Sequence, residues 1–375
     1  MSGFDVTAVR REFPITENCV YVNHAAVGPI SRRVQQAMQE QSELHLTQID
    51  TSREMSLARY EEGRRLAAQL VGSRPEQVAY IQNTSHGISL IANGLTWQAG
   101  DNVVLPELEF PSNYLAWLGL QAQGVELRFM KTENGRLLPD QLHQLIDQRT
   151  KVVTLSHVQF FNGFQCDLAA FGDICQQHGA LLVVDGTQSV GALRVDVGAM
   201  GIDALVVSAH KWMLGPLGIG FMALSPRALQ RLKVAVVGWL SVERPFEFRR
   251  QLDLLPDARR FEPGTENGAG MFGLTARLAQ IQETGAQVIE RRILALTDQF
   301  GEGLHQQGYT ITSPRGLNER SGIVTFTHPH LATEQLFTQL NQANVRASVR
   351  NGAIRISPHY YNSEDEMDFI VNSLP

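Results

Sequence analysis

The sequence predicts an α/β protein built on a mostly parallel central sheet with helices on both faces. From about residue 80 to 225, short apolar runs rich in β-favouring residues alternate with segments of helical periodicity. Those runs are almost continuously apolar, which is typical of parallel strands covered on both sides. With 375 residues and 43% hydrophobic content, the chain can bury a large core, and this length favours two domains.

The individual elements follow from the same patterns. Strands are expected at 102–106, 125–130, 151–157, 180–186, 204–210 and 218–224. A helix is expected over 167–179, because its apolar residues recur at helical spacing and Gly179 stands at its C-terminal end. Ligands of such sheets bind beyond the carboxyl ends of the strands, so the polar residues at those ends are the candidates for function.

Composition excludes several function classes. The net charge is −6 and the isoelectric point is near 6.0, with no basic run, which argues against a nucleic-acid or membrane partner. Cys19, Cys166 and Cys175 show neither zinc-ligand spacing nor a disulfide framework. The start of the chain lacks the apolar core of a signal peptide, and no apolar stretch is long enough to span a membrane. A cytoplasmic protein is therefore expected.

Two neighbouring strand ends carry more polar and ionisable side chains than a hydrophobic core requires. Asp185 ends the all-apolar run ALLVVD, and Lys211 follows the next run, ALVVS. Three further polar residues stand at these ends: Gln188, Ser208 and His210. Taken singly, Asp185 also suits a helix N-cap and Lys211 an ordinary loop.

Together these residues match the needs of one cofactor. Pyridoxal 5'-phosphate requires a lysine amine that binds its aldehyde as a Schiff base, and an acid that faces its pyridine nitrogen. Hydroxyls, imidazoles or helix N-termini must surround its phosphate. The sequence therefore predicts a pyridoxal phosphate site, with Lys211 and Asp185 as the catalytic pair and Gln188, Ser208 and His210 holding the ring and the phosphate.

The segments VVDGTQSVG and DALVVSAHKWMLGPLGIGFM resemble the class V aminotransferase family of fold-type I pyridoxal phosphate enzymes. That family includes cysteine desulfurases, selenocysteine lyases, kynureninases and isopenicillin N epimerase-like proteins. The resemblance extends from residues 21–31 to residues 354–366. It implies an N-terminal segment (1–20) that packs with a small domain, a large cofactor-binding domain (21–270), a smaller α+β C-terminal domain (271–375), and a homodimer with both active sites at the subunit interface.

The same resemblance implies further site residues. Cofactor contacts are implied for Thr84 and Ser85 at the phosphate, Phe110 stacked on the ring, and Thr265 at the phosphate of the partner subunit. Arg355 is expected to bind the substrate α-carboxylate, a task that suits its planar guanidinium. Asn23 and His24 are expected on the substrate side of the site, although His24 equally suits a packed histidine at the subunit interface.

The chain departs from the desulfurases at two places. Those enzymes carry a reactive cysteine on a long loop before the carboxylate-binding arginine, whereas only four residues separate Arg350 from Arg355 here. Many members also place an asparagine near the cofactor's phenolate; in SHVQFFNGF (156–164), Asn162 lies two residues beyond that place.

The expected function is therefore that of a pyridoxal phosphate-dependent lyase acting on an amino acid, by β-elimination or C–S cleavage, without an active-site cysteine persulfide. An aminotransferase that passes the amino group to a keto acid is the alternative enzyme. A non-catalytic, cofactor-binding regulatory or partner subunit is the alternative of another class.

Overall fold

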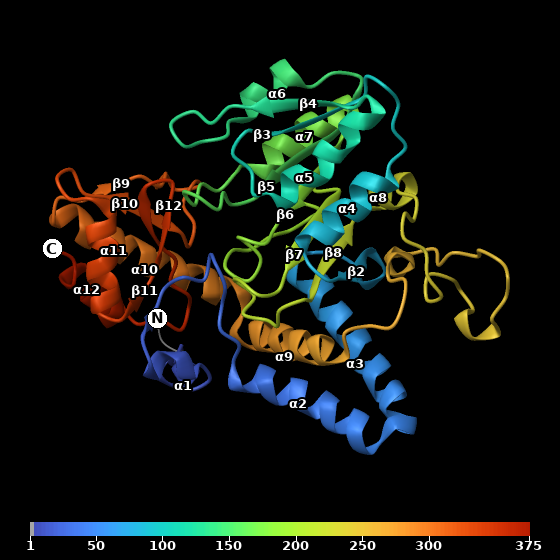
Figure 1. Cartoon of the computed structure of the whole chain (residues 1–375), viewed down its shortest axis with the longest axis horizontal. Coiled ribbons are helices and arrows are strands. Elements are labelled where there is room, and N and C mark those ends of the chain that lie inside the picture. The colour runs from blue at the N-terminus through green and yellow to red at the C-terminus, as the bar shows by residue number, and fades with distance from the viewer. Residues whose placement is uncertain (1–3) are drawn as a thin grey trace.

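A mostly parallel seven-stranded sheet forms the centre of the molecule, as Figure 1 shows. The computed structural model describes residues 4–375, without the side chains of 50–52. The strand order is β2-β8-β7-β6-β5-β3-β4, and only β8 runs antiparallel to its neighbours. The strands are β2 (Val78–Ile81), β3 (Asn102–Pro106), β4 (Glu126–Met130), β5 (Thr150–Ser156), β6 (Leu181–Asp185), β7 (Ala204–Ser208) and β8 (Gly220–Leu224). The predicted fold class is confirmed, and β2 is a strand that the patterns did not reveal.

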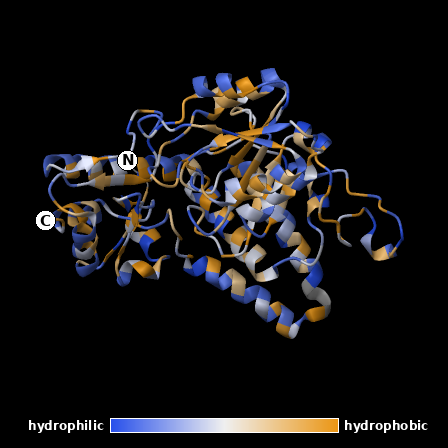
Figure 2. Cartoon of the chain, turned by 45° about the horizontal axis from the view of Figure 1, so that its top comes forward, coloured by the Kyte–Doolittle hydropathy of each residue, from blue (hydrophilic) through white to orange (hydrophobic). Residues whose placement is uncertain are grey.

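Both faces of this sheet are buried, because alternate residues of each strand join different hydrophobic cores. In β6, Leu182 and Val184 belong to one core, whereas Leu181 and Val183 belong to the other. This alternation follows from the two-residue period of a strand. Figure 2 shows the resulting concentration of apolar residues at the centre of the molecule.

Helices cover the two faces. One face packs against α4 (Thr84–Gly94), α5 (Ser112–Leu118) and α8 (Pro226–Arg231), and the other against α3 (Ile49–Leu70), α7 (Leu168–His178) and α9 (Gly268–Thr284). As predicted, α7 ends at Gly179, whose φ of 73° lies in the left-handed region that glycine tolerates best. Two further helices belong to this part, α6 (Pro139–Leu145) and α2 (Arg32–Thr47). Helix α2 packs beside α3 and α9. No helix within residues 4–375 is both long and apolar enough to cross a membrane.

The C-terminal part has a core of its own and a four-stranded antiparallel sheet in the order β12-β13-β10-β9. Its elements are α10 (Ala286–Gln306), β9 (Thr310–Ile311), β10 (Val324–Thr327), α11 (Thr333–Gln342), β11 (Val345–Arg346), β12 (Ser348–Arg350), β13 (Ala353–Ile356) and α12 (Glu364–Asn372). The N-terminal segment joins it: β1 (Val20–Tyr21) pairs with β11, and Arg10 of α1 (Val6–Arg10) forms an ion pair of 2.9 Å with Glu366. The division at residues 20 and 270 stays a prediction; α9, which spans the second boundary, packs against α2 and α3.

Single 3₁₀ turns complete the backbone, at Pro14–Glu17, Pro75–Gln77, Gly119–Gln123, Pro245–Glu247 and Ala258–Phe261. The segment 233–257, here called the arm, projects from the body at the right of Figure 1. Large apolar side chains of the arm are exposed: Val236, Val237, Trp239, Phe246, Phe248 and Leu252.

Candidate active site

A cavity of about 300 Å³ lies at the carboxyl ends of the parallel strands β5, β6 and β7. The register places Ser156 of β5 beside Asp185 of β6, and Ser208 ends β7. Its wall is formed by Ala25, Ala26, Asn83, Thr84, Ser85, Phe110, Ser112, Ser156, Phe160, Asp185, Thr187, Gln188, Ser208, His210, Lys211, Arg350 and Arg355. The volume is at the lower end of the range of small-molecule sites, roughly 300–1,000 Å³.

Asp185 is a buried carboxylate at the end of its strand. The backbone N–H of Thr187 donates a hydrogen bond of 2.8 Å to its Oδ1, and no helix follows it, so Asp185 does not act as a helix N-cap. Burial raises the pKa of Asp185, while the bonds from Thr187 and the charge of Lys211 oppose that rise. Asp185 is therefore available to form an ion pair with a cationic group bound in the cavity.

Lys211 lies across the cavity with its side chain almost fully buried. Burial lowers the pKa of its amine to about 8, although Asp185 favours the charged form. The Nζ atom stands 5.0 Å from the centroid of the Phe110 ring. Gly28 packs closely against the backbone of Lys211, because a Cβ at Gly28 would lie 2.4 Å from the Lys211 carbonyl oxygen.

Three hydroxyls bind one another at one end of the cavity. Thr84 Oγ1 lies 2.8 Å from both Thr187 Oγ1 and Ser208 Oγ, and the Thr84 N–H donates to Ser208 Oγ at 2.9 Å. Helix α4 begins at this point, capped by Asn83. A helix N-terminus surrounded by hydroxyls is a favourable place for a phosphate. Ser85 and His210, the other residues predicted at the phosphate, also line the cavity.

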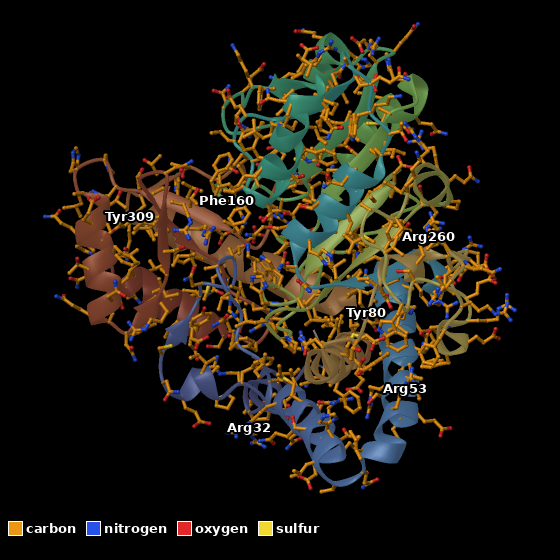
Figure 3. The ribbon with its side chains drawn as sticks, turned by 45° about the vertical axis from the view of Figure 1, so that its right-hand side comes forward. Arg32, Arg53, Tyr80, Phe160, Arg260 and Tyr309 are labelled. Carbon is orange, nitrogen blue, oxygen red and sulfur yellow. The ribbon has the colours of Figure 1, made fainter. Side chains whose placement is uncertain are left out.

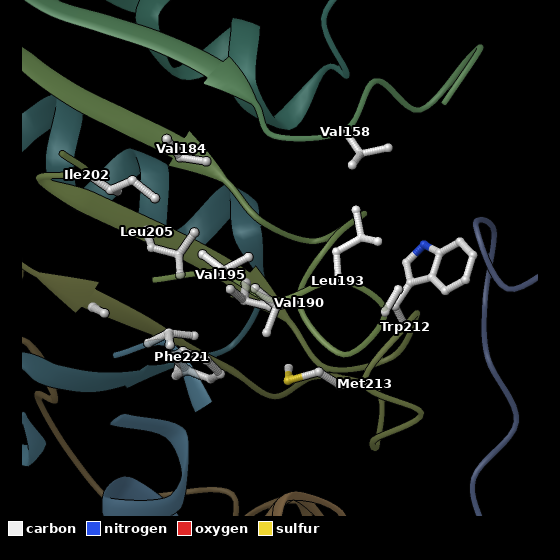
Figure 4. Packing of buried hydrophobic residues seen from close by; sticks show 14 of the residues in the cluster. Val158, Val184, Val190, Leu193, Val195, Ile202, Leu205, Trp212, Met213 and Phe221 are labelled. Atoms are coloured by element: carbon white, nitrogen blue, oxygen red, sulfur yellow. The ribbon is translucent and has the colours of Figure 1, made fainter. Parts of the chain in front are cut away.

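Gln188 connects the cavity to the N-terminal segment. Its amide nitrogen donates to the Ala25 carbonyl oxygen at 2.9 Å, and its oxygen accepts from the Trp212 indole N–H at 2.8 Å. Figure 4 shows the indole of Trp212 among buried apolar side chains that fix this turn.

Two residues predicted on the substrate side lie elsewhere. Neither Asn23 nor His24 is part of the cavity wall, which is formed by the next two residues, Ala25 and Ala26. Both ring nitrogens of His24 are occupied, by the Ser357 carbonyl oxygen and the Tyr361 hydroxyl, each at 2.7 Å. Burial lowers the pKa of His24 to about 4, so this ring is a neutral packing residue.

The region around residue 160 contributes an aromatic side chain, and not Asn162, to the cavity wall. Asn162 binds the Gly135 carbonyl oxygen and the Phe164 N–H and does not reach the cavity. Phe160 occupies the wall instead, edge-on to Phe110 with ring centroids 5.4 Å apart. Figure 3 labels Phe160 where the C-terminal part meets the large sheet. The part of the cavity wall that Phe110 and Phe160 form is therefore aromatic.

Arg355 enters the cavity from the C-terminal sheet. Its Nε donates to Ser348 Oγ at 3.2 Å and its Nη1 to the Phe160 carbonyl oxygen at 2.6 Å. The side chain is buried, and Nη2 has no hydrogen-bond partner within the described residues. An unpartnered guanidinium N–H in a closed wall is suited to a carboxylate.

Sequence reasoning missed Glu109, which lies behind the wall. Its carboxylate accepts from the Ser156 N–H and hydroxyl, each at 2.8 Å, and from the Gln159 amide at 3.0 Å. Burial is the main cause of its raised pKa. No local motif marks this role, because a single Glu before an aromatic residue is common. Thr265, by contrast, is exposed and outside this cavity, so its predicted contact in the partner subunit stays a prediction.

The residues present fit pyridoxal phosphate. The wall contains the amine of Lys211, which can lose its proton near neutral pH, and one carboxylate, that of Asp185. It also contains a hydroxyl-lined helix N-terminus, an aromatic side chain and the unpartnered Nη2 of Arg355. Comparison with known proteins gives the same result, because the family model for class V aminotransferases matches residues 20–369. The chain belongs to this family. It is therefore a pyridoxal phosphate-dependent enzyme.

Several relatives of this family member are named cysteine desulfurases or probable cysteine desulfurases. A probable cysteine desulfurase of Methanothermobacter thermautotrophicus is 28% identical over 98% of this chain and 96% of its own length. A cysteine desulfurase of Klebsiella pneumoniae is 32% identical over 75% of this chain and 73% of its own.

Solved structures show the same fold. An apo cysteine desulfurase from Thermococcus onnurineus has a TM-score of 0.89 at 27% identity, covering 99% of this chain and 98% of that one. A cystine C–S lyase solved with cysteine persulfide has a TM-score of 0.89 at 22% identity, covering 96% of this chain and 98% of its own. At that identity the second likeness concerns the fold alone.

Proposed function

We propose that this enzyme is a C–S lyase that cleaves an amino acid by β-elimination and forms no persulfide on its own cysteines. The observation that carries the proposal is that none of the three cysteines lines the cavity, although all three are among the described residues. Where the desulfurases carry their cysteine loop, this chain has the two-residue turn Asn351–Gly352.

The thiols are also poorly suited to act as nucleophiles. Cys166 and Cys175 are buried, and burial raises the pKa of both, for Cys175 to about 12. Burial raises the pKa of Cys19 as well. Because the thiolate is the nucleophile, such cysteines stay unreactive at neutral pH.

The chemistry follows from the cavity residues. Pyridoxal phosphate, when bound, supplies an electron sink for negative charge at the substrate Cα, and Asp185 pairs with its ring nitrogen. Arg355 holds the α-carboxylate, and the neutral amine of Lys211 takes the proton from Cα. The C–H electron pair becomes the Cα–Cβ double bond, and the Cβ–S pair leaves with the sulfur. Water then hydrolyses the released enamine to pyruvate and ammonia.

A cysteine-free variant tests this function. Cys19, Cys166 and Cys175 are replaced together by serine and, because two of them are buried, in a second variant by alanine. We expect both folded variants to form pyruvate from cystine and related thio-amino acids at nearly the wild-type rate. Loss of activity in Cys166→Ser alone, or a sulfur atom added to a cysteine of the wild-type protein, would contradict the proposal. A keto acid that keeps its sulfur would instead identify an aminotransferase.

We further propose that the active protein is a homodimer. The exposed apolar side chains of the arm and the exposed position of Thr265 support this assembly.

A further inference from the structure

Residues 211–214, here called the lysine turn, are held by side chains from distant parts of the sequence. The Trp212 carbonyl oxygen accepts a hydrogen bond from His359, 147 residues away, and the Met213 carbonyl oxygen accepts one from Arg277, 64 residues away. Figure 4 labels Trp212 and Met213 in this turn. The position of Lys211 therefore depends on segments that lie outside the large sheet.

The last residue of the lysine turn has a conformation that leucine rarely adopts. The Leu214 N–H donates to the Lys211 carbonyl oxygen at 3.0 Å, and its φ of 52° lies in the left-handed region. A residue with a Cβ meets a steric penalty there, so the conformation persists only where surrounding contacts enforce it. Local preferences alone do not hold this turn, and the bonds from other segments are needed.

His359 supplies one of these bonds through a ring with a defined tautomer. The imidazole is buried, and burial together with His24 and Arg277 keeps its pKa well below the usual value, so the ring is neutral. The Tyr360 N–H donates to Nδ1 at 2.8 Å, which places the ring proton on Nε2. Nε2 then donates to the Trp212 carbonyl oxygen at 2.8 Å.

Arg277 of α9 supplies the other bond and is buried without an acidic partner. Its Nε donates to the Met213 carbonyl oxygen at 2.6 Å and its Nη1 to the Tyr360 hydroxyl at 3.1 Å. The side chain is 0% exposed, and no carboxylate among the described side chains lies within 4.0 Å of it. A buried charge without an ion-pair partner opposes folding. Stability therefore does not explain Arg277, whereas its bond to the lysine turn gives it a task.

The segment of His359 also carries Arg355 of the cavity wall. Strand β13 contains Arg355 and ends at Ile356, and His359 follows three residues later. Ser357, between them, is fixed by a bond of 2.7 Å from its N–H to the Val22 carbonyl oxygen. One short segment thus contacts the lysine turn and supplies the guanidinium expected to bind the substrate carboxylate.

We propose that His359 and Arg277 are positioning residues for Lys211. Their hydrogen bonds hold the lysine turn in its strained conformation and thereby keep the Lys211 amine directed into the cavity. Neither residue is part of the cavity wall, so they act through the turn. A displacement of about 1 Å at a reacting group can slow a reaction roughly hundredfold. The inference concerns Lys211 and does not depend on the identity of the substrate.

Two substitutions of His359 separate its two hydrogen bonds. His359→Gln places an amide N–H near the Nε2 position and retains the donor to Trp212, whereas His359→Asn retains only an acceptor for Tyr360. The apoprotein of each variant is mixed with pyridoxal phosphate, and covalent attachment is followed by stopped-flow absorbance. We expect attachment to be roughly tenfold to hundredfold slower in His359→Asn and close to the wild-type rate in His359→Gln.

Pyridoxamine 5'-phosphate measures the rest of the site without the lysine. It carries an amine in place of the aldehyde, so it cannot attach to Lys211. We expect its dissociation constant, measured by calorimetry, to be the same in wild type and in His359→Asn. His24→Asn is the matched control, because it removes an equally buried imidazole whose bonds go to Ser357 and Tyr361. Attachment in this control should proceed at the wild-type rate.

Arg277→Met tests the lysine turn from its other side. The substitution removes the donor to Met213 together with a buried charge, and the loss of such a charge in favour of an apolar side chain often leaves stability unchanged. We expect Arg277→Met to fold, with a Tm near that of wild type, and to attach the cofactor more slowly.

Several results would overturn the inference. Attachment at the wild-type rate in His359→Asn or in Arg277→Met would refute the role of that residue. Equal slowing in His359→Gln and His359→Asn, or in His24→Asn, would assign the effect to lost packing. A parallel loss of affinity for pyridoxamine phosphate would mean that the whole site had loosened.

Discussion

Lys211 gains its chemical usefulness from burial. An exposed lysine has a pKa near 10.4 and is almost fully charged at neutral pH. Loss of hydration in the cavity lowers the pKa of Lys211 to about 8, which leaves an appreciable fraction of neutral amine. Only the neutral form can attack an aldehyde or accept a proton from Cα.

This shift predicts how the apoprotein takes up its cofactor. Below pH 8 the rate of covalent attachment should rise about tenfold per pH unit, because the neutral fraction rises in proportion, and it should level off above pH 8. Stopped-flow absorbance after addition of pyridoxal phosphate measures the rate. If the rate continued to rise up to pH 10, the pKa of the Lys211 amine would not be lowered in the apoprotein.

Borohydride reduction and peptide mapping identify the lysine involved. We expect the pyridoxyl group on Lys211 in wild type and no stable attachment in Lys211→Ala. Lys233→Ala, which removes an exposed lysine outside the cavity, should behave as wild type. Recovery of the group on another lysine would refute the assignment.

At the scale of the element, the hairpin turn depends on glycine at one position. Gly352 has a φ of 76°, and a Cβ placed there would meet no atom within 4 Å, so only backbone strain opposes a side chain. Gly352→Ala should therefore lower the free energy of unfolding by about 1–2 kcal/mol.

Gly119 provides the matched control. It is equally open, but its φ is −60°, so Gly119→Ala should be neutral or stabilising by about 0.4–1 kcal/mol. Urea unfolding of the two variants measures the difference. Equal effects would show that the turn relaxes without cost.

A buried ion pair anchors the segment that carries Thr265. Arg64 of α3 binds Glu262 through two bonds of 2.6 and 3.0 Å, and Glu262 also accepts the Tyr80 N–H at 2.7 Å. Glu262→Ala removes the buried partner of Arg64 and leaves its charge with only the exposed Glu61, whose oxygen lies 3.3 Å from Arg64 Nε. We therefore expect a loss of about 3 kcal/mol in unfolding free energy.

The pair between Arg33 and Glu283 is the exposed counterpart. Its bonds are 2.6 and 2.7 Å long, but its side chains remain 43% and 59% exposed. Glu283→Ala should therefore cost no more than about 1 kcal/mol. Similar losses in both variants, measured by chemical unfolding, would contradict the importance of burial.

For the whole molecule, the arm predicts a dimer whose sites depend on both subunits. Phe248 in the arm is 82% exposed, an unusual position for a phenylalanine in a monomer. Light scattering should find a dimer of the holoprotein, and Phe248→Glu should shift it toward monomer and weaken cofactor retention. Leu317→Glu, at 81% exposure in the C-terminal part, should do neither. A fully active wild-type monomer would disprove the predicted contact of Thr265.

The sequence by itself determined the sheet and the central pair of the site. Six of the seven strands of the large sheet are expected from the sequence. Five of them, β3, β5, β6, β7 and β8, are largely apolar runs buried on both faces. The sixth, the edge strand β4, carries Glu126 and Arg128 and is mostly exposed or half-buried. The proximity of Asp185 and Lys211 could be predicted from the sequence, because neighbouring parallel strands end at the same edge of a sheet.

Only the tertiary structure decided which other residues complete the wall. His24 and Ala25 are adjacent in sequence, yet His24 turns to Ser357 and Tyr361, more than 330 residues away, while Ala25 faces the cavity. Arg350 likewise enters the wall only because β12 and β13 pack their shared face against Phe160. The physical reason is that a local pattern specifies how a residue is buried, whereas its partners depend on contacts between segments distant in the chain.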